Sequence, residues 1–145
     1  RKFIQKTPLR LHRLRAVFMT YQFSKHYSIA EARELLPQVQ SWIDELLTLR
    51  STLGKVDQLL EGRLRTGEDL GGNTVNDRTR TIARFQAILG EFQTHEIQLK
   101  DLDRGLVDFP HLRAGDEVFL CWESGEEDID YWHDLGTGFA GRELL

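Results

Sequence analysis

The stretch SIAEARELLPQVQSWIDELLTLRSTLGKVDQLLE, residues 28–61, decides the fold. It opens with the pattern of a capping box, in which the Ser28 hydroxyl accepts a free backbone N–H and Glu31 reaches back to the N-cap. Apolar residues then recur three and four positions apart, as a heptad seam over four repeats. The rows of this seam are Ala32, Val39, Leu46, Leu53 and Leu60, and Leu35, Trp42, Leu49 and Val56. The pattern predicts a long amphipathic helix, with a kink or a short separate first helix at Pro37.

Beyond this helix, the sequence predicts a loop and a second helix. Glycines at positions 62, 67, 71 and 72 mark the loop. A second helix is predicted over residues 74–104, capped by Asn73 or Thr74 and ended by Gly105 in a left-handed conformation. Its apolar row is Val75, Ile82, Phe85, Leu89, Phe92, Leu99 and Leu102. Two antiparallel helices cannot cover both apolar stripes, so we expect a homodimer, or else coverage by the C-terminal segment.

The last forty residues change character and predict short strands. These are Leu106–Phe109, Glu117–Trp122 and Asp128–His133, with a turn at Ser124-Gly125. The predicted fold class is therefore α+β and mostly α. A long antiparallel helical hairpin (28–61 and 74–104) precedes a small C-terminal antiparallel β-hairpin or three-stranded module with an irregular tail (105–145). Residues 19–145 are expected to form a single domain.

The composition favours a soluble globular domain over a disordered, membrane-spanning or disulfide-rich protein. The chain has 145 residues, of which 40% are hydrophobic and 29% charged, which is typical of a soluble globular domain rather than a disordered one. No apolar run approaches the roughly 18–20 residues that cross a bilayer, so no membrane partner is expected. Cys121 is the single cysteine, which excludes an internal disulfide framework.

The charge is distributed unevenly. The net charge is -4, but residues 1–18 hold six basic side chains and no acid, which leaves the remainder at -10. An acidic body argues against a general polyphosphate binder. The basic stretch has the composition of a nucleic-acid arm or a transit segment, but we interpret residues 1–18 as a non-native or disordered extension ahead of a start at Met19. We expect this extension to be dispensable for folding.

Several strings carry a family resemblance. They are SIAEARELLP at 28–37, LVDFP at 106–110, VFLCW at 118–122, GEEDIDYWH at 125–133 and GFAGR at 138–142. Together they resemble domain-of-unknown-function family 2203, over roughly Tyr27 to Arg142. The resemblance implies a bacterial cytoplasmic protein with a helical hairpin, and it implies no mechanism. The family's signature positions fall on Asp108, Pro110, Cys121, Trp122, Glu126, Trp132, His133, Gly138 and Arg142.

Two kinds of chemistry are weighed for the C-terminal module. Possible metal ligands are Asp108, His111, Cys121, Glu126, His133 and Asp134. Closely spaced ligand pairs are missing, and neighbouring strand residues such as His133 and Asp134 face opposite ways, so no metal or other cofactor is predicted. A thiol triad of Cys121, His133 and Asp108 has the right residue types. Because Cys121 lies within an apolar strand, it is better interpreted as a buried side chain, and no catalytic residue is assigned.

A polar cluster in the same module is the preferred candidate site. It comprises Asp108, Trp122, Glu126, Trp132, His133 and Arg142. We expect Arg142 to pair with Glu126 or a neighbouring acid near Trp132, with His133 donating into the same network. Such a cluster either ties the glycine-rich tail to the strands or forms a recognition surface for a peptide, a small anion or a partner protein.

A second candidate site lies at the predicted hairpin tip. It contains Arg63, Arg65, Arg78, Arg80 and Arg84, an arrangement suited to RNA, although nearby acids favour a salt-bridged, solvated tip. Three functions follow. The leading prediction is a non-catalytic cytoplasmic interaction or scaffold module that self-associates through its helices and binds an unidentified protein partner. The alternatives are an RNA- or ribosome-associated factor that uses the arginine tip, and an enzyme with a site around Cys121, Glu126 and His133.

Overall fold

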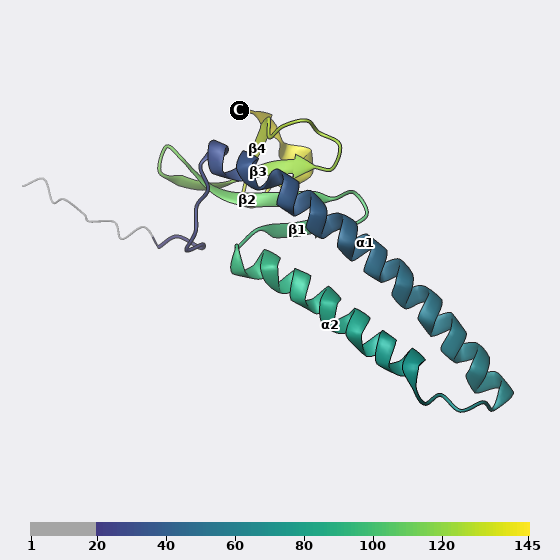
Figure 1. The fold of residues 1–145 in the computed structure, drawn as a ribbon. Helices are drawn as coiled ribbons and strands as arrows, with labels where there is room; N and C mark the ends of the chain where they lie inside the picture. Colours follow the sequence, from purple (N-terminus) through teal and green to yellow (C-terminus); the bar gives the residue numbers. More distant parts are fainter. Residues whose placement is uncertain (1–19) are drawn as a thin grey trace, which may run out of the picture.

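A computed structural model describes residues 20–145, and the interpretation of residues 1–18 as an extension lies outside these described residues. Two helices, one short 3-10 helix and five strands follow one another along the chain. They are α1 (Ile29–Thr66), α2 (Asn73–Thr94), β1 (Gln98–Asp101), β2 (Leu106–Arg113), β3 (Asp116–Glu123), β4 (Tyr131–Asp134), η1 (Phe139–Gly141) and β5 (Glu143–Leu144). The helices form a hairpin that lies against the sheet and extends beyond it (Figure 1).

Helix α1 begins with the predicted capping box. The Ser28 hydroxyl accepts the Glu31 backbone N–H at 3.1 Å, and the Glu31 carboxylate accepts the Ser28 N–H at 2.7 Å. The predicted short separate helix ahead of Pro37 is wrong, because α1 runs unbroken from Ile29 to Thr66. A proline removes one backbone donor, and burial of Ala32 and Val39 on either side of it holds this part of the helix in place.

Helix α2 is shorter than predicted, because it ends at Thr94 rather than at residue 104. Glu96 adopts the left-handed conformation, with φ of 54°. The Ile97 N–H bonds to the Phe92 carbonyl and the Glu96 N–H bonds to the Gln93 carbonyl, both at 3.0 Å, which is a Schellman ending. The chain then turns into β1, so Leu99 and Leu102 do not belong to the helix.

The predicted two- or three-stranded module is also wrong. The strands form one five-stranded antiparallel sheet in the order β1-β2-β3-β4-β5. Gly105 joins β1 to β2 instead of capping a helix, with φ of 63°, and a Cβ there would collide with the Ser124 hydroxyl. Ala114 and Gly115, with φ of 51° and 90°, form a tight two-residue turn that joins β2 to β3.

The helices cover one face of the sheet and create the core. Val107, Phe109, Leu120 and Trp122 of β2 and β3 belong to the same buried cluster as α1 and α2. The buried helical members are Ala32, Val39, Trp42, Ile43, Leu46, Ile88 and Phe92. Between residues 47 and 87 no residue is buried. At the base of this segment Leu47, Leu49 and Phe85 still pack against the core, and the rest of it projects past the sheet (Figure 1). We call residues 47–87 the arm and the other described residues the body.

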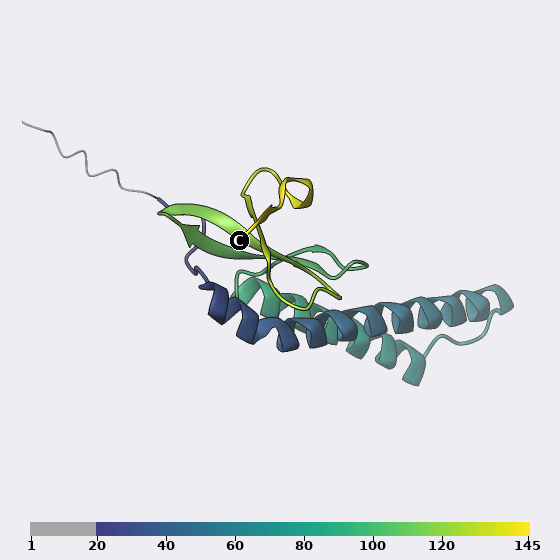
Figure 2. The same cartoon turned by 90° about the horizontal axis from the view of Figure 1, so that it is seen from above.

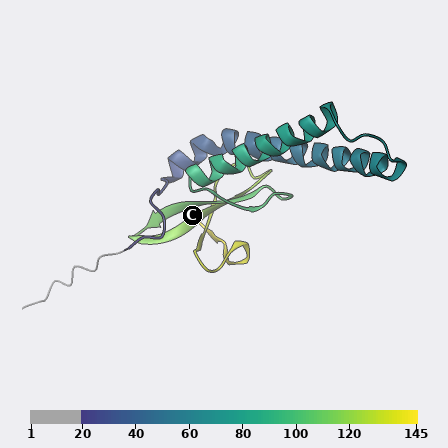
Figure 3. The same cartoon turned by 90° about the horizontal axis from the view of Figure 1, so that it is seen from below.

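The opposite face of the sheet is covered by the two ends of the described chain. The tail, residues 135–145, includes η1 and lies on the side of the sheet away from the helices (Figures 2 and 3). A strap, residues 20–27, leads into α1 and places Phe23 edge-on to Phe119 of β3, with ring centroids 5.4 Å apart. The strap and the tail therefore form a layer that covers this face of the sheet.

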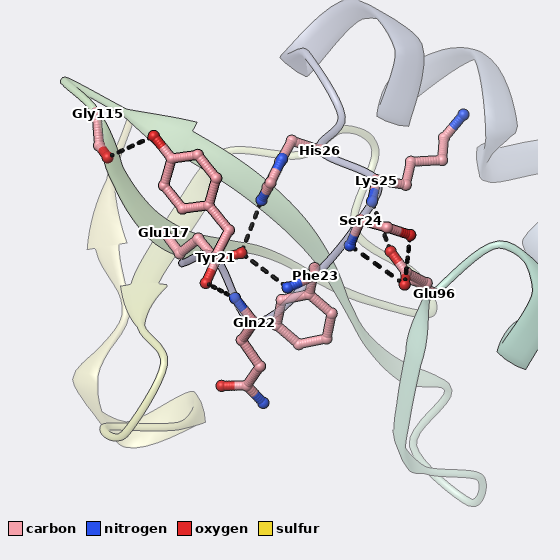
Figure 4. Close-up of polar contacts among 9 residues, drawn as sticks. All are labelled: Tyr21, Gln22, Phe23, Ser24, Lys25, His26, Glu96, Gly115 and Glu117. Carbon is pink, nitrogen blue, oxygen red and sulfur yellow. Dashed lines mark hydrogen bonds and ion pairs between the residues drawn. The ribbon is translucent and has the colours of Figure 1, made fainter. Parts of the chain in front are cut away.

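Two carboxylates hold the strap (Figure 4). Glu117 accepts the Gln22 and Phe23 backbone N–H groups at 2.7 and 2.9 Å, and it pairs with His26 at 2.7 Å. Glu96 accepts the next two backbone N–H groups of the strap, at 3.3 and 2.6 Å. These contacts join residues 71–95 positions apart in the chain, so no local pattern could predict them.

Candidate functional site

Three neighbouring strands bring Asp108, Cys121 and His133 together on the face away from the helices. Asp108 of β2 stands directly opposite Cys121 of β3, and His133 of β4 stands opposite Phe119, one diagonal step from Cys121. One donor atom from each of the three residues lies within 4.8 Å of the other two, and all three residues are buried. We call this set the buried triad.

The contacts of His133 define its tautomer. Its Nδ1 lies 2.7 Å from the Asp134 backbone carbonyl, and a carbonyl only accepts, so Nδ1 carries a hydrogen. In the neutral ring the Nε2 lone pair then faces Asp108 Oδ1 at 3.0 Å. The two groups form an ion pair only when the ring is protonated. Neither atom has a hydrogen-bond partner among residues 20–145.

The Cys121 thiol lies in an environment that keeps it protonated. Burial first, and then the negative charge of Asp108 and a hydrogen bond with it, raise the pKa of this thiol to about 12 against smaller opposing effects from Arg142. A nucleophilic cysteine needs the opposite, a lowered pKa and partial exposure. The residues of the predicted thiol triad are therefore adjacent, but their environment does not activate the thiol for attack.

Arg142 forms the predicted pair with Glu126. Its Nη1 donates to Glu126 Oε1 at 2.7 Å, and both side chains are partly buried. The guanidinium also lies over the rings of Phe139 and Tyr131, at 3.8 and 4.3 Å from their centroids. Glu126 is held in turn, because its other oxygen accepts the Glu123 backbone N–H at 2.9 Å. This network ties the tail to the loop that follows β3.

The residues of the predicted polar cluster do not form one network, because they lie on both faces of the sheet. Trp132 pairs with Leu120 on the helix side of the sheet, away from Arg142, and the Arg113 guanidinium lies over its ring at 4.5 Å. Trp122 also faces the helices and donates its indole N–H to the Glu126 carbonyl at 3.0 Å. His133 contacts Asp108 instead of donating into the Arg142–Glu126 network. The expectations that placed Trp132 and His133 in that network are wrong.

The arginine tip is neutralised by acids. All five arginines lie within 4.0 Å of a carboxylate. The pairs are Arg63–Glu68, Arg65–Glu61, Arg78–Asp57, Arg80–Asp77 and Arg84–Glu45. Arg84 lies farther from the tip than expected, because it faces Glu45 in the body end of α1. The arrangement matches the salt-bridged, solvated interpretation of the tip.

Comparison with known protein families shows to which family the chain belongs. The profile of the family described as Uncharacterized conserved protein (DUF2203) matches residues 25–145, which include both helices, the sheet and the buried triad. The chain belongs to this family. Comparisons with curated proteins and with solved structures give no match. Among the described residues of this DUF2203 member, no helix is long and apolar enough to cross a membrane.

Proposed function

We propose that this DUF2203 protein is a non-catalytic interaction module that self-associates through its arm. The observation that carries the proposal is the exposed apolar surface of the arm. Leu59 is 49% exposed, Leu64 is 61% exposed and Val75 is 39% exposed. Several exposed apolar side chains on one projecting segment are a feature of interaction sites.

The arm continues the seam that builds the body. Leu46 is fully buried against the core, whereas Leu53 and Leu60, one and two heptads further along α1, are only partly covered. Among residues 20–145, the parts of α1 and α2 that lie beyond the sheet have only each other and their connecting loop to contact. Two helices cannot bury stripes that are wider than their mutual contact, and a four-helix arrangement can.

A second copy of the chain is the occupant that best fits this surface. The arm holds seven basic and five acidic side chains, a nearly balanced surface that suits a partner of the same composition. Its arginines already pair with carboxylates in the same chain. Twenty residues of α1 span about 30 Å, and two helices side by side about 20 Å. That face approaches the ~800 Å² per partner of a standard interface.

The alternatives have less support. An RNA-binding tip would present unpaired positive charge, and the five tip arginines are paired. An enzyme built on Cys121 would need an accessible, acidic thiol, and Cys121 is buried with a raised pKa. The proposal places the protein in the bacterial cytoplasm, in keeping with an unpaired cysteine.

Light scattering after size-exclusion chromatography tests the proposal. The wild-type chain at micromolar concentration should give twice the chain mass. The double variant Leu59→Glu/Leu64→Glu adds charge at exposed positions, so it should fold and yet give the monomer mass. Leu144→Glu is the matched control, because Leu144 lies in β5 of the body and is 70% exposed. This variant should remain a dimer.

Two results would reject self-association through the arm. One is a wild-type monomer that persists at high concentration. The other is a dimer that survives the double variant but dissociates in the Leu144→Glu control, which would place the interface on the body.

A further inference from the structure

We propose that Asp108, Cys121 and His133 form a binding site for one zinc ion. The three residues offer a carboxylate oxygen, a thiolate sulfur and an imidazole nitrogen, which are the ligand types that zinc takes in proteins. The site lies on the sheet face away from the helices, so the proposal is independent of self-association through the arm.

The unpartnered atoms of the buried triad point to a cation. Asp108 Oδ1 and His133 Nε2 lie 3.0 Å apart, are buried, and have no hydrogen-bond partner among the described residues. When the ring is neutral with its hydrogen on Nδ1, a lone pair of Nε2 and a carboxylate oxygen lie at that distance with no hydrogen between them, which is repulsive in a low-dielectric interior. A positive charge between them removes the repulsion and satisfies both atoms.

The orientation of the His133 ring is the one that metal-binding histidines show. A ligating histidine donates its second ring N–H to a carbonyl or carboxylate, which fixes the ring and makes the free nitrogen a better ligand. His133 donates Nδ1–H to the Asp134 carbonyl at 2.7 Å, and this leaves Nε2 directed at Asp108. The hydrogen bond that would orient His133 as a metal ligand is therefore already formed.

The spacing and the charge also suit a divalent ion. Ligand atoms of tetrahedral zinc lie about 3.3–3.6 Å apart, and the three donor atoms here lie within 4.8 Å of one another. The Asp108 carboxylate and a Cys121 thiolate together carry two negative charges, which one Zn²⁺ neutralises. Three donors leave a fourth position for water or for the second Asp108 oxygen.

Binding displaces a proton from Cys121. Cysteine binds zinc as its thiolate, whereas an ordinary cysteine thiol is mostly protonated at neutral pH. Coordination forms a Zn–S bond, breaks the S–H bond and sends the proton to the buffer. The affinity should therefore fall as the pH is lowered.

Cobalt(II) titration of the full chain tests the proposal directly. The chain is first treated with a chelator and kept in a thiol-free reductant. Because Cys121 is the only cysteine, a thiolate-to-cobalt charge-transfer band must come from this residue. We expect that band to saturate at one cobalt per chain and to disappear when Zn²⁺ is added. Calorimetry in two buffers should show release of at least one proton.

Matched variants locate the site. Cys121→Ser should abolish the band, and Asp108→Asn should weaken binding at least about tenfold, with folding checked by circular dichroism. Asp134→Asn is the control, because the Asp134 side chain is exposed and faces the other side of β4, while its carbonyl still accepts from His133. It should bind like the wild type. A hundredfold excess of Zn²⁺ over its Kd should raise the wild-type melting temperature by about 5–10 °C.

Several results would overturn the proposal. They are no saturable binding, binding without the charge-transfer band, and saturation at one cobalt per two chains, which would mean that cysteines of two molecules share the ion. All three outcomes are measured on the wild-type chain. The test therefore remains decisive even if a variant fails to fold.

Discussion

The body and the arm are built from one heptad seam and yet differ in what covers it. In the body, Leu46 and Ile43 are at most 1% exposed, because the sheet lies across the hairpin there. In the arm, Leu59 and Leu64 are about half exposed or more, and polar contacts are mostly surface ion pairs. Periodicity therefore specifies a helix and its apolar face, but it does not say what buries that face. We propose that the arm is the part of the molecule that a partner covers.

The largest difference between the body and the arm should appear in the free energy of unfolding when one leucine in each region is replaced by alanine. Leu46→Ala opens a cavity in a fully packed core and should lower the free energy of unfolding by about 3–4 kcal/mol. Leu64→Ala should change it by less than about 0.5 kcal/mol in the dilute chain. Urea unfolding at low concentration measures both. Equal losses would mean that the arm has a core of its own.

Arg142→Ala should produce the next largest loss, about 2 kcal/mol. The Arg142–Glu126 pair is only partly buried, so its value lies between the 0–1 kcal/mol of a surface pair and the roughly 3–5 kcal/mol lost when a buried pair is broken. The variant also loses the stacking on Phe139 and Tyr131. Arg142→Lys, which keeps the charge, should recover only part of the loss. Unchanged stability in Arg142→Ala would mean that the tail is not held by this network.

The strap should make the body sensitive to acid. Hydrogen bonds from the Lys25 and Ser24 backbone and the Ser24 hydroxyl lower the pKa of Glu96. Burial raises the pKa of Glu117, but hydrogen bonds from His26, Phe23 and Gln22 outweigh it and hold that pKa below its ordinary value.

Because both folded-state pKa values lie below the ordinary 4.5, the folded protein binds fewer protons than the unfolded chain in this range. Their stabilising effect is complete above about pH 4.5 and is lost as the pH falls through the folded values. Glu117→Gln should cost about 1–2 kcal/mol at pH 7 and flatten the acid decline of the melting temperature between pH 5 and 3. An identical decline in wild type and variant would exclude Glu117 as its source.

The smallest effect should come from the ion pairs of the arm. Arg78 and Asp57 are 2.7 Å apart but about half exposed, so Arg78→Ala should cost at most about 1 kcal/mol. In 1 M salt this cost should become smaller, because salt screens interactions between exposed charges. A cost above 2 kcal/mol that persists in salt would mean that Arg78 is buried, for instance against a second copy.

Local rules predict much of α1 and the positions of β2, β3 and β4, but not β1 or β5. The capping box at Ser28 and the pairing of Arg142 with Glu126 follow from residue types and spacing. Strand β1 was assigned to a helix because the left-handed position that ends α2 is held by Glu96 instead of glycine. The β2–β3 turn was missed because Ala114 also adopts a positive φ, which only its partners in the sheet impose.

The buried triad shows where the prediction of a site from sequence stops. Its residues were among the possible metal ligands, but none of them lies at a spacing typical of a metal motif. Asp108 and His133 meet Cys121 only because strand register places them there. That register depends on the Ala114-Gly115 turn, which the sequence pattern does not specify, and on the loop before β4, of which the pattern predicts only the Ser124-Gly125 turn. The unpartnered atoms that favour a cation appear only in three dimensions.

Hydrogen–deuterium exchange at two protein concentrations tests the central claim most directly, that a second copy covers the arm. Backbone amides of residues 47–87 should be protected at high micromolar concentration and should exchange faster on dilution and in Leu59→Glu/Leu64→Glu. Amides of β2 and β3 in the body should exchange at the same rate in all three samples. Arm exchange that is independent of both concentration and the double substitution would contradict the claim.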